Sequence, residues 1–153
     1  MNRMSGRARQ YQEVEVQTSV EDANPHQLVQ MLLEGGIDRI AKAKGAIARR
    51  DVAKKCHYIS LAMTILDGLS ASLDLEAGGE IADNLAALYD YMARRLVQAN
   101  IASSPRSPDP DSAVTILDEV TNLLEEIKAG WEAIAHQVGG AQSFAAAAQS
   151  AGE

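Results

Sequence analysis

Hydrophobic side chains recur at steps of three and four residues along most of this chain, which is the spacing of one face of an α-helix. Glycine, proline or a capping residue stands wherever the repeat is interrupted. No stretch alternates hydrophobic and polar positions as a half-buried β-strand would. We therefore predict four long helices, over residues 25–50, 52–77, 78–100 and 110–138.

Residues at the expected helix ends support these boundaries. Asn24 followed by Pro25 is a typical helix start, because the side-chain oxygen caps free backbone N–H groups and proline fixes a helical φ angle. Asp51 and Asp109 can cap the second and fourth helices in the same way. Glycine readily takes the left-handed conformation of a helix end, so Gly78–Gly79 is expected to terminate the second helix.

The third predicted helix carries more hydrophobic surface than one buried face requires. One stripe consists of Ile81, Leu85, Leu88, Met92, Leu96 and Ala99. A second stripe beside it consists of Ala82, Ala86, Tyr89, Ala93 and Val97. A helix on the outside of a small domain normally buries one stripe and exposes a polar face. The second stripe is therefore expected either to bury a partner or, through its alanines, to widen the core contact.

Helices of matched length joined by short turns pack most simply as an antiparallel four-helix bundle, so the predicted fold class is all-α. We expect the bundle to span residues 24–138 as one domain. Residues 1–23 hold few hydrophobic side chains and are expected to form a short, partly mobile N-terminal segment. The low-complexity sequence GGAQSFAAAAQSAGE, residues 139–153, is expected to be a disordered tail.

Composition and charge narrow the function. Hydrophobic residues make up 46% of the chain but aromatic residues only 4%, a balance that favours helices. The net charge of −7 argues against general affinity for nucleic acid or for an anionic membrane. A single cysteine, Cys56, rules out an internal disulfide and fits a reducing compartment. No hydrophobic run is long enough for a signal peptide or a membrane span, so we expect a cytoplasmic protein.

The sequence lacks the patterns of common metal and catalytic sites. A di-metal centre in a four-helix bundle needs Glu-x-x-His pairs, and the chain has none, so no metal or cofactor is expected. Histidine phosphotransfer is the enzymatic alternative, with His57 as acceptor and Lys54 one turn away to hold a phosphate. Tyr58 crowds that histidine, so we favour a surface residue and predict no enzyme. A generic structural or self-associating bundle is a further alternative.

The pair Gly35–Gly36 lies inside the first predicted helix, where each glycine is about 1 kcal/mol less favourable than alanine. Such a pair indicates that another backbone or side chain passes close to the helix. Close packing within the bundle and contact with a bound segment both explain it. The sequence leaves these two interpretations open.

Four sequence blocks resemble the FliS family of flagellin export chaperones. Tyr11–Gln12 is similar to the family's N-terminal Tyr-Gln, and NPHQLVQMLLEGGIDRIAKAKGAI is similar to its first long helix. LDLEAGGEIADNLAALYDYMARRLVQAN is the most specific block, with Gly-Gly-Glu, Leu-Tyr-Asp-Tyr-Met and Arg-Arg-Leu ahead of Ala-Asn. LDEVTNLLEEIKAGWEAI resembles the last helix, including its late tryptophan. The likeness covers about residues 10–138, nearly the whole predicted bundle.

The resemblance implies a four-helix bundle that holds newly made flagellin in the cytosol. Its ligand would be the C-terminal segment of flagellin, which the chaperone keeps from polymerising too early. The complex would then be presented to the flagellar type III export gate. In the family the segment wraps around the bundle and uses apolar grooves on the helices, and the N-terminal region covers part of that surface beforehand. A second apolar stripe suits such a helix-in-groove contact.

The resemblance and the apolar stripes together predict ten partner-binding residues: Tyr11, Gln12, Leu32, Leu33, Gly36, Ile40, Leu85, Tyr89, Met92 and Asn100. Two departures from the family pattern bear on this set. Leu33–Glu34 stands where the family usually has an aromatic residue followed by Asp, so an apolar contact survives there but a hydroxyl contact is lost. The proline-rich linker SSPRSPDP, residues 103–110, looks longer than the family's third connection and could alter docking at that end.

Overall fold

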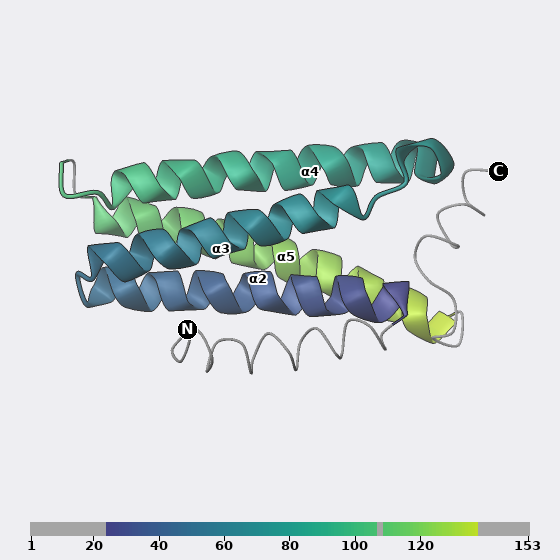
Figure 1. The fold of residues 1–153 in the computed structure, drawn as a ribbon, viewed down its shortest axis with the longest axis horizontal. Coiled ribbons are helices and arrows are strands. Elements are labelled where there is room, and N and C mark those ends of the chain that lie inside the picture. The colour runs from purple at the N-terminus through teal and green to yellow at the C-terminus, as the bar shows by residue number, and fades with distance from the viewer. Residues whose placement is uncertain (1–23, 107–108, 138–153) are drawn as a thin grey trace, which may run out of the picture.

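The computed structural model describes residues 24–106 and 109–137, which form four long α-helices (Figure 1). These helices are α2 (Pro25–Ala48), α3 (Val52–Ala71), α4 (Leu75–Ala102) and α5 (Pro110–Gln137). No β-strand occurs in these ranges. The all-α fold class predicted from the sequence is therefore confirmed. The predicted N-terminal segment (1–23) and C-terminal tail (139–153) lie outside the described residues.

Consecutive helices run in opposite directions and form a closed ring of neighbours (Figure 1). α2 packs against α3 and α5, and α4 packs against the same two helices from the other side. α2 and α4 therefore stand diagonally across the bundle, as do α3 and α5. This arrangement is the antiparallel four-helix bundle that the hydrophobic spacing predicts.

Three helix starts lie where the sequence places them. The side-chain oxygen of Asn24 accepts a hydrogen bond from the Gln27 backbone N–H, and the Gln27 side chain accepts one from the Asn24 N–H, which is a complete capping box. Asp51 caps α3 by accepting from the Lys54 N–H at 3.1 Å. Asp109 caps α5 in the same way. These caps satisfy backbone donors that a helix start leaves without partners.

The boundary between the second and third helices differs from the prediction. α3 ends at Ala71, well before the two glycines, and α4 already begins at Leu75. Asp74 explains the early start, because its carboxylate accepts the Ala77 backbone N–H at 3.0 Å and caps α4. Gly79 instead forms a kink inside α4, with φ 56° and ψ −135°. The Asp74 cap therefore starts α4 before the two glycines, and the backbone bends at Gly79 within the helix.

Hydrophobic side chains from all four helices fill the centre of the bundle. The largest fully buried side chains are Leu33, Ile40, Ile59, Leu69, Met92, Leu96, Leu117, Leu124 and Val120. Trp131 joins this core with only 5% of its surface exposed, as its place in the hydrophobic stripe of α5 predicts. On α4 the later part of the first stripe (Met92, Leu96 and Ala99) is buried, whereas Ile81 at its start is 48% exposed.

The glycine pair in α2 serves internal packing. A Cβ atom added to Gly36 would meet Leu124 Cδ1 at 3.3 Å and Ile65 Cγ2 at 3.5 Å. A Cβ atom added to Gly35 would meet Ile65 Cδ1 at 3.3 Å. These contacts are tight, so side chains of α3 and α5 already occupy the space above the pair. Of the two interpretations left open by the sequence, the structure supports close packing within the bundle.

Candidate partner-binding surface

The seam between α3 and α4 is held by one small polar cluster near the end of α4. Asn100 Oδ1 accepts a hydrogen bond from Lys55 Nζ at 2.8 Å and lies 3.6 Å from Cys56 Sγ. The Asn100 backbone carbonyl also accepts from Lys55 Nζ, at 3.1 Å. Among the described residues these are the only side-chain hydrogen bonds between the two helices. The rest of the seam therefore depends on apolar contact.

Asn100 fixes which flank of each helix faces this seam. Side chains seven residues apart on an α-helix lie on nearly the same face. Ala93 and Ala86 precede Asn100 by one and two such steps on α4, and Met63 follows Cys56 by one step on α3. Met63 and Ala93 are both half-buried and pack against the hydrophobic core, so they belong to an apolar strip along this seam.

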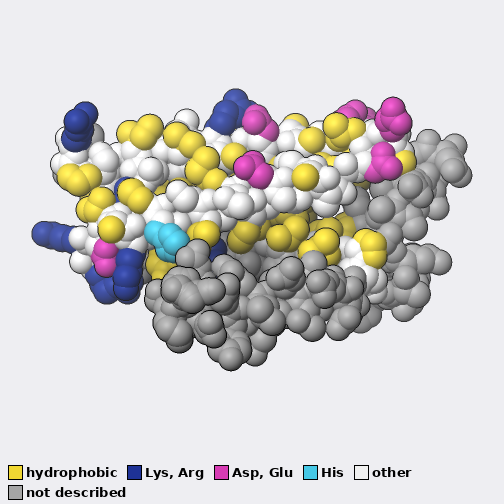
Figure 2. Space-filling model, viewed as in Figure 1, with side chains coloured by type: hydrophobic (Ala, Val, Ile, Leu, Met, Phe, Trp, Pro, Cys, Tyr) yellow, Lys and Arg dark blue, Asp and Glu magenta, His cyan; other side chains and the backbone are white. Residues whose placement is uncertain are grey.

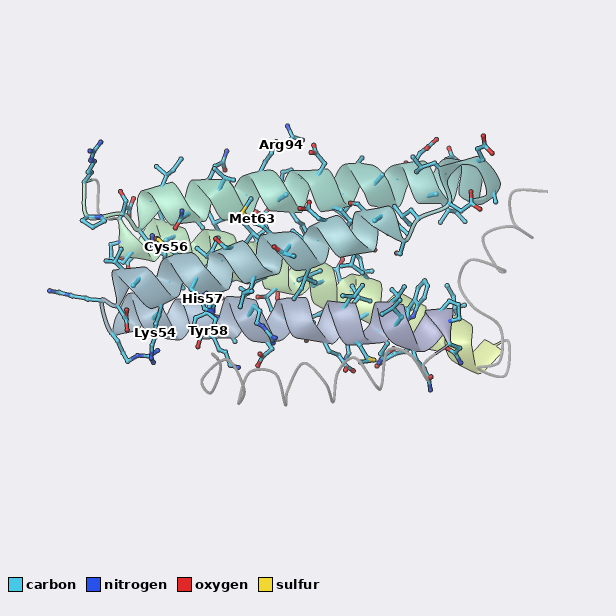
Figure 3. The ribbon with its side chains drawn as sticks, viewed as in Figure 1. Lys54, Cys56, His57, Tyr58, Met63 and Arg94 are labelled. Carbon is cyan, nitrogen blue, oxygen red and sulfur yellow. The ribbon has the colours of Figure 1, made fainter. Side chains whose placement is uncertain are left out.

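We define the α3–α4 surface as the apolar side chains along this seam: Val52, Cys56 and Met63 on α3, and Ala86, Ala93 and Val97 on α4. Val97 is 42% exposed and Val52 is also exposed, while the other four are half-buried. Figure 3 shows Cys56 and Met63 on the face that α3 and α4 present to the viewer. Hydrophobic side chains form a broken band along the same face in Figure 2.

Two other seams of the bundle, α4–α5 and α2–α5, are bridged by charged and polar side chains. Between α4 and α5, Glu119 accepts hydrogen bonds from the Tyr91 hydroxyl and from Arg95 Nε, both at 2.7 Å. These two hydrogen bonds, with that from Tyr91 the stronger influence, lower the pKa of the Glu119 carboxyl. Between α2 and α5, Lys44 pairs with Asp118. The α3–α4 surface is the contrasting case, apolar and open.

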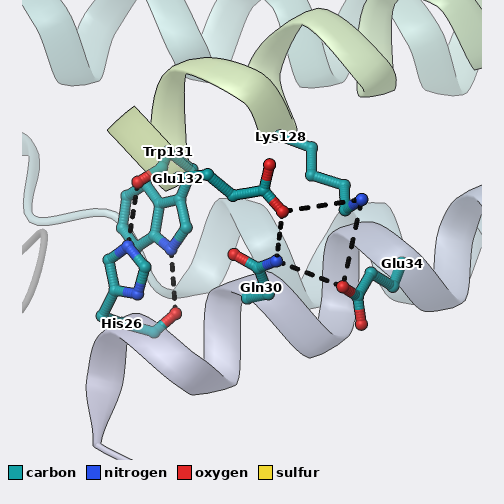
Figure 4. Close-up of polar contacts among 6 residues, drawn as sticks. All are labelled: His26, Gln30, Glu34, Lys128, Trp131 and Glu132. Carbon is teal, nitrogen blue, oxygen red and sulfur yellow. Dashed lines mark hydrogen bonds and ion pairs between the residues drawn. The ribbon is translucent and has the colours of Figure 1, made fainter. Parts of the chain in front are cut away.

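A second polar group joins α2 to α5 at the other end of the bundle (Figure 4). Gln30 donates to Glu132 at 2.7 Å and to Glu34 at 3.1 Å. Lys128 lies 3.6 Å from the Glu132 carboxylate and 4.0 Å from that of Glu34. These contacts tie the first turns of α2 to the last turns of α5.

Half of the ten predicted contact residues lie in the core. Leu33, Gly36, Ile40, Tyr89 and Met92 are buried, so the assembled bundle does not offer them to a partner. Tyr89 is the clearest correction, because the second stripe of α4 led us to expect an outer anchor there. Its side chain is 3% exposed and belongs to the hydrophobic core. The stripe divides along its length, with Ala82 and Tyr89 inside and Val97 on the surface.

The remaining predicted contact residues are half-buried or lie outside the described part. Leu32 is half-buried on α2, next to Gly68 of α3. Leu85 is half-buried and lines a small cleft of about 70 Å³ near the start of α4. Asn100 is half-buried in the polar cluster that joins α3 to α4. Tyr11 and Gln12 lie outside the described residues. For these five residues, contact with a partner stays a prediction.

Two polar residues, His26 and Lys55, make buried contacts that were not predicted from the sequence. His26 was not singled out, yet its Nε2 donates to the Trp131 carbonyl at 2.9 Å and its ring stacks on the indole. Lys55 was not singled out, although its side chain is 2% exposed. Its place in the helical repeat carries the signal, because Lys55 stands four residues before Ile59 on the core face.

His57 is exposed on α3, with its ring 5.3 Å from that of Tyr58 (Figure 3). Within residues 24–106 and 109–137, no three His, Cys, Asp or Glu side chains are grouped so that they could bind a metal ion. None of the helices in the same ranges is both long enough and apolar enough to span a membrane. Within the described residues, the α3–α4 surface is therefore the candidate partner-binding site.

An apolar strip at the surface of a four-helix bundle is suited to the mode in which a helix of another polypeptide lies against an apolar face. The comparisons with known proteins agree on one family. The model of the family described as flagellar protein FliS matches residues 7–138, which include all four helices. The chain belongs to this family.

Curated relatives from distant bacteria carry matching descriptions. The flagellar secretion chaperone FliSB of Pseudomonas aeruginosa is 44% identical over 128 residues, covering 84% of this chain and 94% of that protein. The flagellar secretion chaperone FliS of Salmonella typhimurium is 41% identical, covering 81% of this chain and 86% of that protein. The flagellar secretion chaperone FliS of Bacillus subtilis is 32% identical, covering 76% of this chain and 79% of that protein. None of these relatives supports the phosphotransfer hypothesis for His57.

Proposed function

We propose that this protein is a flagellin export chaperone. It binds the C-terminal segment of flagellin in the cytosol, prevents premature polymerisation and delivers the complex to the flagellar type III export gate. The observation that carries the proposal is the family match over residues 7–138, together with relatives described as flagellar secretion chaperones. No catalytic step is needed for this role, and the proposal includes no cofactor.

The α3–α4 surface supports the proposal by its shape and chemistry. A disordered segment that folds on binding typically buries about 1,000–3,000 Å², which several shallow apolar patches can supply. Val97 and Met63 offer such area along the seam, and the alanines of α4 allow a partner backbone to approach closely. We therefore assign part of the flagellin contact to this surface. The half-buried Leu32 and Leu85 are proposed as further contacts.

Titration calorimetry of this protein with the C-terminal helical segment of flagellin from the same organism tests the proposal. We expect tight binding near one to one, with a clearly negative heat-capacity change from burial of apolar surface. Absence of heat, together with absence of co-migration on a sizing column, would contradict the proposed client. A stable homo-oligomer that ignores the flagellin segment would instead support a self-associating bundle.

A further inference from the structure

The turn from α2 to α3 and the C-terminal end of α4 lie at the same end of the bundle (Figure 1). A pocket of about 450 Å³ opens there. Its walls are mainly apolar, with Ala46, Ile47, Val52, Pro105 and Pro110. Its polar lining consists of Arg50, Asp51, Lys55, Ser103 and Ser104. Apolar walls with a few convergent polar groups are typical of a pocket that binds a small chemical group. We call it the Lys55 pocket.

Lys55 is the unusual member of this lining. Its side chain is 2% exposed, which is rare for a lysine unless a counter-charge lies beside it. Nζ donates to Asn100 Oδ1 and to the Asn100 carbonyl, and both acceptors are uncharged. Among the described residues no carboxylate lies within ion-pair distance of Nζ. An ammonium group has three donors, so one donor has no partner among the described residues, while the Asn100 carbonyl places the charge at the negative end of α4.

The charges around the pocket favour an anion. Arg50 and Lys55 bring two positive charges, against one negative charge from Asp51. The Asp51 carboxylate already accepts the Lys54 backbone N–H as the cap of α3. Arg50 adopts a left-handed conformation with φ 57°, which is strained for a residue with a side chain. Counted by its lining residues, the pocket carries a net positive charge within a chain whose net charge is −7.

We propose that the Lys55 pocket binds a carboxylate group of a peptide, with Lys55 Nζ as its charged donor. The inference rests in part on the proposed function, in which that peptide is the flagellin segment. Charge-assisted hydrogen bonds between an ammonium and a carboxylate are about twice as strong as neutral ones, and the buried setting strengthens them further. The pocket then supplies the counter-ion that the fold itself does not give Lys55.

Continuity with the α3–α4 surface favours a peptide over a free small anion. Val52 lines the Lys55 pocket and also begins the α3–α4 surface. Asn100 joins the two sites, because its side chain contacts both Lys55 and Cys56. A segment that lies along the seam from Met63 towards Val52 therefore reaches the pocket with its end or with an acidic side chain. The apolar walls would receive the neighbouring aliphatic groups.

The pocket can be tested without flagellin by a matched pair of probes. N-acetyl-leucine carries a carboxylate, and N-acetyl-leucinamide has the same shape without the charge. We expect millimolar N-acetyl-leucine to shift the backbone amide NMR signals around Lys55 and Ser103, and the amide to shift them far less. Equal shifts from both probes, or no shift from the acid, would overturn the proposal even if every variant failed to fold.

Two lysine substitutions separate the specific role of Lys55 from a general loss of charge. Lys55→Met keeps the length of the side chain but removes the two hydrogen bonds to Asn100, so circular dichroism is used to check its fold before binding is measured. Lys54→Met removes the same charge from the exposed neighbouring position. We expect affinity for N-acetyl-leucine to fall about tenfold or more in Lys55→Met and to stay unchanged in Lys54→Met. Unchanged affinity in Lys55→Met would make Lys55 merely a cap of α4.

The flagellin segment then identifies the source of the carboxylate. The segment with a free C-terminus is compared with the same segment as a C-terminal amide, using the wild type and Lys55→Met. If the amide binds the wild type more weakly than the free segment does, while Lys55→Met binds both segments equally, the carboxylate is that of the chain end. If both segments bind the wild type equally and Lys55→Met binds both more weakly, the carboxylate belongs to an acidic side chain. Binding to the wild type that is unaltered by Lys55→Met would contradict a role in client recognition. If neither segment binds the wild type, the proposed function fails while the result with the leucine probes still decides the pocket.

Discussion

At the scale of single residues, Trp131 and His26 form a reciprocal contact between α5 and the first turn of α2. The Trp131 indole Nε1 donates to the His26 carbonyl at 2.8 Å, and His26 Nε2 donates back to the Trp131 carbonyl at 2.9 Å. The two rings stack with their centroids 4.8 Å apart. Both polar groups are thus satisfied although the residues are buried, as buried aromatic side chains with a polar atom require.

Trp131→Ala is expected to destabilise the bundle by about 3–5 kcal/mol, because it removes a large buried side chain and leaves a cavity. Urea unfolding followed by circular dichroism measures the change in the free energy of unfolding. Trp131→Phe is the matched control, since it keeps most of the apolar area and loses the hydrogen bond, which should destabilise by about 1–2 kcal/mol. Equal stability of the alanine variant and the wild type would contradict this account of the contact.

Tyr89 shows a different situation: it is 3% exposed and lines the cleft of about 70 Å³ near the start of α4, and within residues 24–106 and 109–137 its hydroxyl forms no hydrogen bond. Burial raises the pKa of the Tyr89 phenol to about 12 from its ordinary value of 10.0. The ring therefore stabilises the core through its apolar area. We expect Tyr89→Ala to destabilise by about 3–5 kcal/mol and Tyr89→Phe to be neutral or slightly stabilising at pH 7.

The raised pKa of Tyr89 also predicts a loss of stability in alkali. Below pH 10 the phenol is protonated in both states, so its contribution is fully present. Between pH 10 and about 12 the unfolded chain loses this proton while the folded chain keeps it, so stability falls by about 1.4 kcal/mol per pH unit. Urea unfolding of the wild type and Tyr89→Phe across pH 9–12 measures the difference. Parallel pH profiles would show that the phenol ionises equally easily in both states.

At the scale of the helices, the kink in α4 depends on Gly79. Its φ of 56° with ψ −135° is a conformation that residues with a Cβ atom rarely adopt. No atom lies within 4 Å of the position of an added Cβ, so backbone strain is the sole obstacle to a side chain. The kink lets α4 begin at Leu75, directly after its cap Asp74, and still meet the core along its later turns.

Gly79→Ala is accordingly expected to destabilise the protein by about 1–3 kcal/mol. Gly130→Ala is a matched control in α5, because that glycine is exposed and its added Cβ also meets no atom within 4 Å. Its helical backbone suits alanine, so this variant should gain about 0.5–1 kcal/mol. Thermal unfolding of both variants gives the comparison. A stable Gly79→Ala protein would show that α4 can straighten without loss.

At the scale of the whole molecule, hydrophobic spacing and capping residues were sufficient to predict the bundle. Asn24, Asp51 and Asp109 marked three helix starts correctly, because a cap acts through backbone groups only a few residues away. The remaining boundary was wrong because Asp74 and Gly78–Gly79 compete locally. Which signal prevails depends on how α4 packs against the other helices, and a linear sequence does not contain that information.

The candidate site was less predictable than the fold. The helical repeat places Leu33 and Met92 on apolar faces, but it does not tell which apolar face turns inward once two stripes lie side by side. The Lys55 pocket was beyond sequence reasoning altogether, because it joins the α2–α3 turn to the end of α4. Such a pocket exists only after distant segments have come together in the fold.

The position of the client contact gives the last prediction. Val97→Glu places a charge on the α3–α4 surface at a side chain that is 42% exposed, so the fold should change by less than about 0.5 kcal/mol. Ile81→Glu is the matched control on α4, since Ile81 is 48% exposed and lies outside that surface. Burying an unpaired carboxylate against an apolar partner is unfavourable, so Val97→Glu should weaken binding of the flagellin segment about tenfold or more. Titration calorimetry compares the two variants with the wild type. Because both substitutions add the same charge to the same helix, equal weakening would indicate general repulsion, and only a selective loss in Val97→Glu places the client on the open seam.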